Sequence, residues 1–264
     1  MHRSPLLHGF TLPVQALVVG ATGGIGLAMS QQLAGNPQVA RLFVVARAAT
    51  RNAALAALVA QSDGRVVALD CDIRDETALA ALAEAIARMV PCLHLVINTA
   101  GVLHDSTDAH ALRPEKSLTQ VTAASLQASF AINAFAPILL AKALLPLLRH
   151  AAPVVYASLS ARVGSIGDNR IGGWYSYRAA KAAQNQLLKT LAIELARLNR
   201  QSIVLVLHPG TTDSGLSKPF QANVSAEKLF SPAFAAAALL QVIAARRPAD
   251  SGNFYAWDGQ SIDW

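Results

Sequence analysis

The chain alternates short apolar runs with longer segments of helical spacing, and this alternation constrains its fold more than any other feature. Such a pattern is typical of a parallel sheet built from strand–helix–strand units. The runs "LVV", "FVV" and "LVI" are apolar on both faces, as strands covered by helices on both sides must be. The pattern predicts an α/β fold, a three-layer α/β/α sandwich with a seven-stranded parallel sheet. The predicted strands begin at Val14, Arg41, Arg65, Cys92, Ala152, Gln201 and Asn253.

The length and composition indicate one well-packed unit. A chain of 264 residues fits one α/β domain, and no linker-like stretch divides it, so we expect residues 1–264 to form a single domain. A hydrophobic fraction of 53% with 14% charged residues indicates a filled core. The longest polar insert, residues 103–120, follows the fourth predicted strand, at the end of the sheet where α/β folds bind their ligands.

The net charge of +6 comes from scattered basic residues, of which Arg246 and Arg247 are the one adjacent pair. A mildly basic surface, or a phosphorylated small ligand, explains this charge better than a nucleic-acid surface does. Cys71 and Cys92 lie far apart in the sequence without ligand-like neighbours. They favour buried thiols in a reducing compartment over a disulfide or a metal site. We expect no nucleic-acid partner and no bound metal.

The apolar segments look too short to cross a bilayer. Prolines and polar residues interrupt residues 1–20 before a signal-type core develops. The stretches at 138–148 and 233–245 fall short of a membrane span, and Lys142 interrupts the first of them. We therefore expect a cytoplasmic protein that does not interact with membranes.

A glycine-rich turn joins the first predicted strand to the first helix. The turn reads "GATGGIG", residues 20–26, and the helical "LAMSQQLAG" follows it. A turn this tight lets backbone amides approach a pyrophosphate at the positive end of the helix, although glycines also serve ordinary strand–helix packing. Its position favours a dinucleotide site, and hence a Rossmann-type domain. The residues predicted to bind the cofactor here are Gly20, Thr22, Gly23, Gly24, Ile25 and Gly26.

The end of the second predicted strand indicates which dinucleotide binds. A Rossmann domain specific for NAD has an acidic residue there that holds the ribose hydroxyls. Here Ala46 is followed by Arg47, which can bind a 2′-phosphate, and no carboxylate is present to repel that group. We therefore predict NADP(H), with Arg51 as a second candidate contact. The alternative is that Arg47 is a solvent-exposed residue at a helix start.

The stretch "GGWYSYRAAKAA" contains a tyrosine and a lysine at helical spacing. Tyr177 and Lys181 are four residues apart and share one helix face, whereas Tyr175 and Lys181 do not. A nearby ammonium favours the phenolate and brings the pKa of a tyrosine towards the working range of an acid–base catalyst. This spacing also occurs by chance in surface pairs. Its significance depends on its position after the fifth strand, downstream of a cofactor turn.

Several motifs together resemble the short-chain dehydrogenase/reductase (SDR) family over nearly the whole chain. They occur in the order "GATGGIG", "CDI", "NTAG", "FAINAFAP", "YSYRAAK" and "HPGTTDS". The longer stretches "SARVGSIGDNRIGGWYSYRAAKAA" and "FYAWDGQSIDW" are more narrowly similar to the C-factor-like and sniffer-type carbonyl reductase branch of that family. The resemblance implies one Rossmann domain that carries both the cofactor site and the substrate site.

The resemblance also implies roles for individual residues. Tyr177 is the expected catalytic acid–base, and Lys181 is its electrostatic partner and a ribose contact. Asn133 is expected to hold a water that relays protons from Lys181. Asp72 and Ile73 are expected to bracket the adenine. The other expected cofactor contacts are Asn98, Ala100, Gly101, Pro209, Gly210, Thr212 and Ser214, the last standing where the family usually has threonine.

One position departs from the family pattern. The fifth strand of the family usually ends Ser-Ser-x-x-Gly, and its second serine donates a hydrogen bond to the substrate carbonyl. This chain has Ser160, Ala161 and then Gly164 at the anchor position. Ser160 can replace the missing donor only if the backbone turns there, because successive strand side chains point to opposite faces. We hypothesise that it does; Ser158 and Ser165 are the other hydroxyls nearby.

These observations predict an NADP-dependent oxidoreductase that transfers hydride between the nicotinamide and a small carbonyl or alcohol substrate. The alternative is a nucleotide-binding sensor or signalling protein with little reductase activity, because the usual serine is missing. The resemblance also implies a homodimer or homotetramer assembled through helices 125–149 and 175–198. Leu216, Phe220 and Phe230 suggest an apolar substrate wall or core positions, but nothing in the sequence names the substrate.

Overall fold

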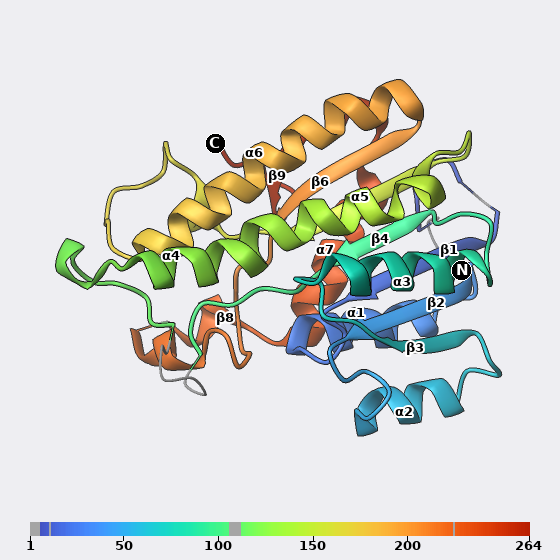
Figure 1. Cartoon of the computed structure of the whole chain (residues 1–264), viewed down its shortest axis with the longest axis horizontal. Helices are drawn as coiled ribbons and strands as arrows, with labels where there is room; N and C mark the ends of the chain where they lie inside the picture. Colours follow the sequence, from blue (N-terminus) through green and yellow to red (C-terminus); the bar gives the residue numbers. More distant parts are fainter. Residues whose placement is uncertain (1–5, 11, 106–111, 224) are drawn as a thin grey trace.

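The computed structural model describes residues 6–10, 12–105, 112–223 and 225–264. Within these residues, seven strands form one parallel sheet in the order β3-β2-β1-β4-β5-β6-β9 (Figure 1), which confirms the predicted sheet. The strands are β1 Val14–Val19, β2 Val39–Ala46, β3 Val66–Asp70, β4 Leu95–Asn98, β5 Val154–Leu159, β6 Ser202–His208 and β9 Asn253–Ala256. Two-residue strands, β7 Thr211–Thr212 and β8 Leu229–Phe230, form a second parallel pair that the sequence did not predict.

Three predicted strand starts differ from the observed ones by two residues or more, and one of these is β5, which begins at Val154 rather than Ala152. Strand β2 begins at Val39, two residues before the predicted start, because Val14 of β1 already pairs with it there. Strand β4 begins at Leu95 rather than Cys92. The reason is that the Leu93 amide donates a hydrogen bond to the carbonyl oxygen of Leu147, at the end of a helix, instead of to a neighbouring strand.

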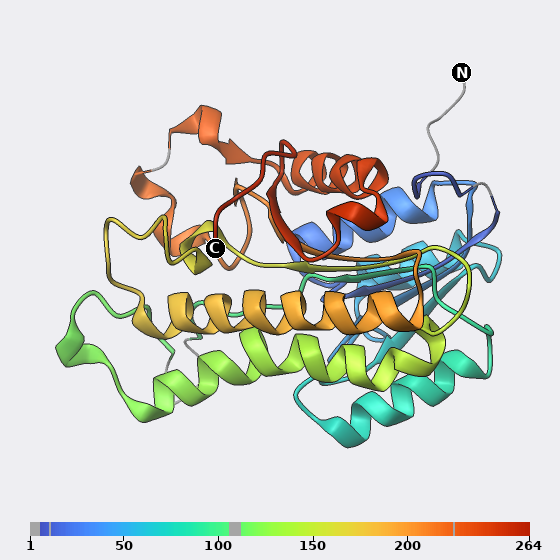
Figure 2. The same ribbon diagram turned by 90° about the horizontal axis from the view of Figure 1, so that it is seen from above.

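Helices cover both faces of the sheet, as Figure 2 shows with the sheet between two helical layers. Alternate strand residues serve two separate cores, so that Ala16 and Val18 of β1 face one helical layer and Leu17 and Val19 face the other. The first layer contains α1 Gly24–Ala34, α2 Ala53–Ala60 and α7 Pro232–Ala245. The second contains α3 Glu76–Ala87, α4 Ala123–Phe130, α5 Ala136–Leu148 and α6 Tyr175–Leu198. The predicted three-layer sandwich is therefore confirmed.

Helices α4 and α5 are joined without a break by a π-helical turn, η2 Ala131–Phe135. The resulting helix, Ala123–Leu148, has 26 residues, and its most apolar 18-residue window has a mean hydropathy of 1.8, so by length and composition it could cross a membrane. The prediction that the apolar stretch is too short is therefore wrong for this helix. Half of its most apolar window is buried inside the molecule, as in the core helix of a globular domain. The remaining short helices are η1 Leu118–Gln120, η3 Arg162–Gly164, η4 Lys218–Asn223, η5 Ala226–Lys228 and η6 Pro248–Asp250.

The strand order reverses between β1 and β4, which are neighbours in the sheet although they are far apart in sequence. In doubly wound sheets, the loops at the carboxyl ends of two such strands diverge and leave a crevice for a ligand. Here the crevice lies between Gly20, which follows β1, and Thr99, which follows β4.

Candidate active site

The glycine turn brings helix α1 close against strand β1. Gly20 has a φ of 80°, which favours glycine. A Cβ added to Gly26 would lie 2.2 Å from the Gly20 carbonyl oxygen, so no larger residue fits between the strand and the helix. Helix α1 begins after Gly23 without a side-chain cap and without an acidic residue in its first turn. Its first amides therefore lack a side-chain acceptor and are available to an anion.

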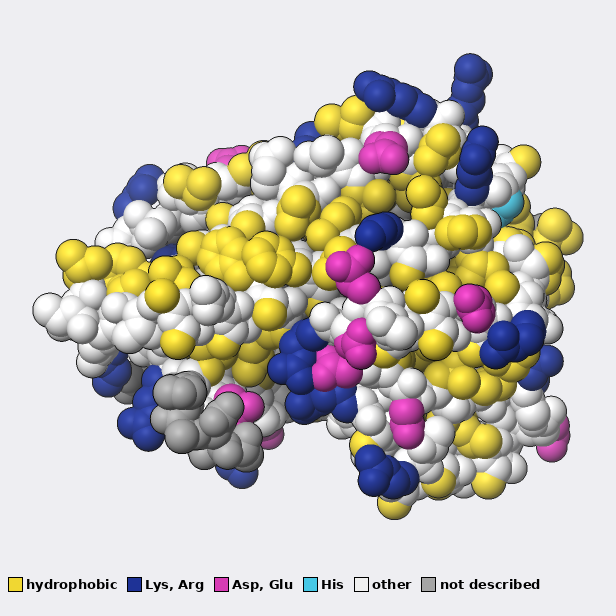
Figure 3. All heavy atoms as spheres, in the orientation of Figure 1, with side chains coloured by type: hydrophobic (Ala, Val, Ile, Leu, Met, Phe, Trp, Pro, Cys, Tyr) yellow, Lys and Arg dark blue, Asp and Glu magenta, His cyan; other side chains and the backbone are white. Residues whose placement is uncertain are grey.

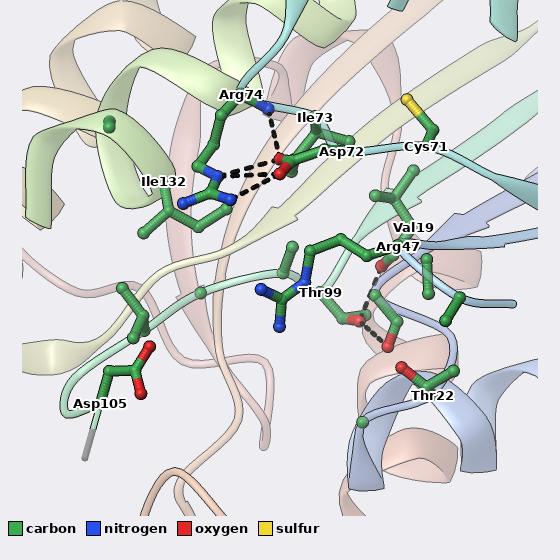
Figure 4. Close-up of a pocket in the computed structure, with 18 of the residues that line it drawn as sticks. Val19, Thr22, Arg47, Cys71, Asp72, Ile73, Arg74, Thr99, Asp105 and Ile132 are labelled. Carbon is green, nitrogen blue, oxygen red and sulfur yellow. Dashed lines mark hydrogen bonds and ion pairs between the residues drawn. The ribbon is translucent and has the colours of Figure 1, made fainter. Parts of the chain in front are cut away.

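A cavity of about 540 Å³ opens beside this turn (Figure 4). We call it the first cavity. It is lined from the ends of β1, β2, β3 and β4, and the side chain of Arg47 extends into it. Arg51 is not among its lining residues. The predicted cofactor residues that line the first cavity are Gly20, Thr22, Gly23, Arg47, Asp72, Ile73, Ala100 and Gly101.

The carboxylate of Asp72 forms a hydrogen-bonded ion pair with Arg74. The Arg74 Nε lies 2.9 Å from Oδ1 of Asp72, and the Arg74 Nη2 lies 2.5 Å from Oδ2. Hydrogen bonds from Arg74 are the main cause that lowers the pKa of Asp72 below its usual value, and the charge of Arg47 contributes a little. Sequence reasoning missed Arg74; its signal is an arginine two residues after the acid at the end of β3.

A second cavity, of about 630 Å³, lies beyond the turn and shares Gly23, Thr99, Ala100 and Gly101 with the first. The two cavities therefore form one continuous cleft along the carboxyl edge of the sheet. The predicted residues that line the second cavity are Gly23, Gly24, Ile25, Gly26, Ala100, Gly101, Ser160, Tyr177, Lys181, Pro209, Gly210, Thr212 and Ser214.

Tyr177 and Lys181 both line the second cavity, on the inner face of α6, whereas Tyr175 is exposed. The Nζ atom of Lys181 lies 5.8 Å from the centre of the Tyr177 ring. It donates hydrogen bonds to the Leu159 carbonyl oxygen (3.0 Å) and to Oε1 of Gln184 (2.9 Å). The spacing argument thus identified the two residues that share this face.

Burial controls the protonation of both groups. It lowers the pKa of Lys181 to about 7 and raises the pKa of Tyr177 above its usual value. The expected lowering of the Tyr177 pKa by the ammonium is therefore not seen. The physical reason is desolvation, which disfavours the charged form of each group, while the lysine nitrogen is bonded to other oxygens.

Asn98 and Asn133 are fully buried and lie beneath the cleft rather than along its wall. Asn133, in the π-helical turn, bonds both backbone groups of Val102: its Nδ2 donates to the carbonyl oxygen at 2.8 Å, and its Oδ1 accepts from the amide at 3.0 Å. A Cβ added to Gly101 would lie 3.2 Å from Oδ1 of Asn133 and 3.6 Å from Nζ of Lys181. Gly101 therefore leaves open the narrow space between these two side chains.

Ser160 lies at the edge of the second cavity with its hydroxyl bonded to Asn185. The Ser160 Oγ donates to Oδ1 of Asn185 at 2.7 Å, and the residue is buried. Ala161 is extended, with φ −143° and ψ 147°, so the backbone does not turn between them. Ser160 could replace the missing serine only if the backbone turned here, and this structure does not show that turn. The hydroxyl hydrogen of Ser160 is also already donated to Asn185.

Aromatic side chains form the outer wall of the second cavity. Trp174 packs at 5.0 Å from Phe220 and at 6.3 Å from Tyr177, measured between ring centres. Leu216 and Phe220 line the cavity as the sequence suggested. Phe230 instead packs on Trp257, at 4.5 Å, and is absent from the lining. Sequence reasoning missed Trp174, since nothing at that position marks it as facing a cavity.

The described residues fit a dinucleotide. Three features suit a phosphorylated nucleotide: the glycine turn, the uncapped N-terminus of α1 and the Arg47 guanidinium in the first cavity. The adjoining second cavity is lined by Tyr177 and Lys181. Among the described residues, no group of three His, Cys, Asp or Glu side chains could hold a metal ion. The fold and site thus define a Rossmann-type protein with a Tyr–Lys pair beside its nucleotide cleft.

The chain belongs to the short chain dehydrogenase family, whose model matches residues 15–225. This confirms the family resemblance. The 1-hydroxy-2-glutathionyl-2-methyl-3-butene dehydrogenase of Rhodococcus sp. (strain AD45) is 32% identical over 252 residues, which cover 94% of this chain and 98% of that protein. The C-signal of Myxococcus xanthus is 30% identical over 148 residues, covering 56% of this chain and 84% of that protein.

Two solved structures share the fold closely. They are the NADPH-bound carbonyl reductase from chicken fatty liver and the carbonyl reductase Sniffer of D. melanogaster. Each has a TM-score of 0.83 and 24% sequence identity, and each comparison covers 96% of this chain and 100% of the other. The similarity to the sniffer-type branch is therefore also confirmed, as a likeness of fold.

Proposed function

We propose that this protein is an NADP(H)-dependent oxidoreductase that interconverts a carbonyl compound and an alcohol. The observation that supports this best is that Tyr177 and Lys181 line the same cleft as the glycine turn. The family is one of dehydrogenases, and the curated relative from Rhodococcus is named as a dehydrogenase of an alcohol.

The bound cofactor would supply or accept the hydride, and the chain's own residues would position the substrate and move the proton. Tyr177 is the proposed acid–base. Its raised pKa keeps the phenol protonated near neutral pH, which is the form that can donate a proton to a carbonyl oxygen during reduction. Lys181 lies beside the ring and would contact the ribose, while Asn133 would hold a water across the gap left by Gly101. The aromatic wall at Trp174 would exclude water from the substrate.

The preference for NADP(H) over NAD(H) is supported by Arg47 at the end of β2. Its side chain extends into the first cavity, at the position where a 2′-phosphate of an adenosine would lie in this fold. One carboxylate in this cavity, that of Asp72, is hydrogen-bonded to Arg74 and so is already paired with a cation.

The first experiment is a calorimetric titration of the protein with NADPH and, separately, with NADH. We expect NADPH to bind more tightly, and the Arg47→Ala variant to lose most of that difference. Turnover of a panel of carbonyl compounds should then be abolished in Tyr177→Phe, while NADPH binding remains. If neither nucleotide binds, the oxidoreductase proposal fails.

A second candidate function is nucleotide-dependent sensing or signalling with little reductase activity. It is favoured by the Ser160 hydroxyl, which is bonded to Asn185 and leaves the expected carbonyl donor missing. The C-signal of Myxococcus xanthus is among the curated relatives. Tight NADPH binding without turnover of any carbonyl in the panel would favour this function over the first.

We also infer a homodimer or homotetramer formed through the continuous helix of α4, η2 and α5 and through α6, with a small molecule as substrate and neither nucleic acid nor a membrane as partner. Phe135 in η2 and Ile193 in α6 are about half exposed, which supports an apolar contact surface. A reducing, cytoplasmic location is supported by Cys71 and Cys92, which are free thiols.

A further inference from the structure

A buried glutamine lies directly behind the lysine of the site. Gln184 is fully buried on α6 and is three residues after Lys181. Its Oε1 lies 2.9 Å from Nζ of Lys181, and its Nε2 lies 2.8 Å from Oγ of Ser158 and 3.1 Å from the Leu159 carbonyl oxygen. A lysine ammonium only donates hydrogen bonds, so Gln184 must present its oxygen to Lys181 and its NH₂ group to strand β5.

The hydrogen bonds continue from Gln184 to the floor of the cleft. The Oγ of Ser158 also accepts from Nδ2 of Asn98, at 3.0 Å. The Oδ1 of Asn98 in turn accepts from the amide of Ala100, at 3.2 Å, and Ala100 lines both cavities. One buried chain of hydrogen bonds therefore joins the lysine nitrogen to the turn after β4. A connected network of this kind restricts the orientation of each of its members.

We propose that Gln184 is a positioning residue for Lys181, whose amide oxygen anchors the ammonium to strand β5 and leaves one N–H directed into the cleft. Two of the three N–H groups of Lys181 are used by Leu159 and Gln184. The nitrogen faces Gly101, because a Cβ added there would lie 3.6 Å from it. This inference rests on the proposed role of Lys181 in binding the cofactor and assisting Tyr177.

The amide oxygen of Gln184 also opposes the loss of charge on Lys181. Burial alone lowers the lysine pKa to about 7, so small changes in its surroundings change its charge at neutral pH. The other titratable groups that line the second cavity with it are Tyr177 on α6, Arg162 on η3 and His208 at the end of β6. No Asp or Glu is among the residues that line the second cavity in the described part of the chain. Neutral oxygen acceptors therefore provide the stabilisation that a carboxylate would otherwise give.

The test is to follow the ionisation of Lys181 directly. The chain has six lysines, so ¹³C-lysine labelling gives few NMR signals, and Lys181→Arg assigns the one that matters. In Gln184→Met, which keeps the volume and removes the acceptor, we expect a lower pKa for Lys181. In Gln184→Glu, which adds a negative charge at the same atom, we expect the pKa to rise by about one unit or more. Gln186→Met, on the exposed side of the same helix, is the matched control and should change neither.

A merely structural role of Gln184 would not shift the Lys181 pKa in opposite directions in the two variants. If both variants leave the Lys181 pKa unchanged, or move it in the same direction, the proposal is overturned. If Gln184→Met does not fold, Gln184→Glu and Ser158→Ala still test the proposal. Ser158→Ala removes the acceptor of the Gln184 NH₂ group. It should lower the Lys181 pKa, by less than Gln184→Glu raises it.

Turnover then separates this inference from the proposed function. Where both hold, the pH profile of kcat shifts in each variant in the same direction as the Lys181 pKa. Opposite shifts of the pKa in a protein without carbonyl turnover would uphold the role of Gln184 and refute the oxidoreductase. Turnover with an unchanged Lys181 pKa in both variants would uphold the oxidoreductase proposal and refute the role of Gln184.

Discussion

Two glycines of the glycine turn have different roles: Gly26 is required for packing, and Gly23 leaves room for a ligand. A Cβ at Gly26 would lie 2.2 Å from the Gly20 carbonyl oxygen and 2.5 Å from Oγ1 of Thr99, whereas the nearest atom to a Cβ at Gly23 lies at 3.4 Å. We expect Gly26→Ala to lower the free energy of unfolding by about 1–3 kcal/mol or more. Gly23→Ala should unfold like the parent protein yet bind NADPH weakly, because its methyl group occupies the cleft. Urea denaturation and calorimetry of both variants measure this; equal losses of stability would contradict it.

The Asp72–Arg74 pair predicts a second effect at the residue scale. Without Arg74, the Asp72 carboxylate is free to pair with Arg47, whose charge already acts on it. That pairing would compete with a 2′-phosphate. We expect Arg74→Met to weaken NADPH binding about threefold to fivefold and to leave NADH binding unchanged, since partly exposed pairs contribute about 0.2–1 kcal/mol. Titrations with each nucleotide at low and high salt check this. A similar loss for both nucleotides would mean that Arg74 acts on the adenine instead.

At the scale of elements, the polar insert after β4 caps the helix that carries Tyr177. Helix α6 starts after Trp174, which has a φ of 52° and gives no side-chain cap. The buried carboxylate of Glu115 instead accepts from the amide of Ser176, at 3.2 Å, and from its hydroxyl, while the Glu115 carbonyl oxygen accepts from the Trp174 amide. A carboxylate at this position also suits the positive end of the helix.

Removal of this cap should destabilise α6 at its start. We expect Glu115→Ala to lower the free energy of unfolding by about 1–3 kcal/mol, because a buried amide and hydroxyl lose their acceptor. Glu115→Gln keeps one acceptor and should cost less. Denaturant unfolding measures both, with Lys116→Ala as an exposed control in the same segment. Equal stability of Glu115→Ala and the control would show that the cap contributes nothing.

At the scale of the whole molecule, the sequence predicted the sheet and most of the cleft because both depend on local patterns. Buried strands are apolar runs, and the motifs lie at their carboxyl ends, so Gly26, Arg47 and Tyr177 could be located from order alone. The network behind the site could not be predicted in this way. Gln184 contacts Ser158 across 26 positions, and Glu115 contacts Ser176 across 61, so only the folded chain brings each pair together. Isolated polar residues of this kind carry no periodic signal.

The last prediction concerns the assembly of the whole molecule. Figure 3 shows hydrophobic side chains gathered over the face where Figure 1 places α4, α5 and α6. Phe135 in η2 and Ile193 in α6 are 49% and 53% exposed. A two-fold contact would pair this surface with itself and remove both side chains from water. We expect the protein to sediment as a dimer or tetramer.

A charge on this face should break the assembly, because association would then bury an unpaired carboxylate. We expect Ile193→Asp to sediment as a monomer with unchanged circular dichroism. Leu12→Asp places the same charge at another exposed hydrophobic position, before β1, and should keep the oligomeric state of the parent. A parent protein that sediments as a monomer, or an Ile193→Asp variant that still associates, would exclude the proposed interface on the α4–η2–α5 helix and α6. Nucleotide titration of the monomeric variant then tests whether the cleft is complete within one chain, as its lining residues lead us to expect.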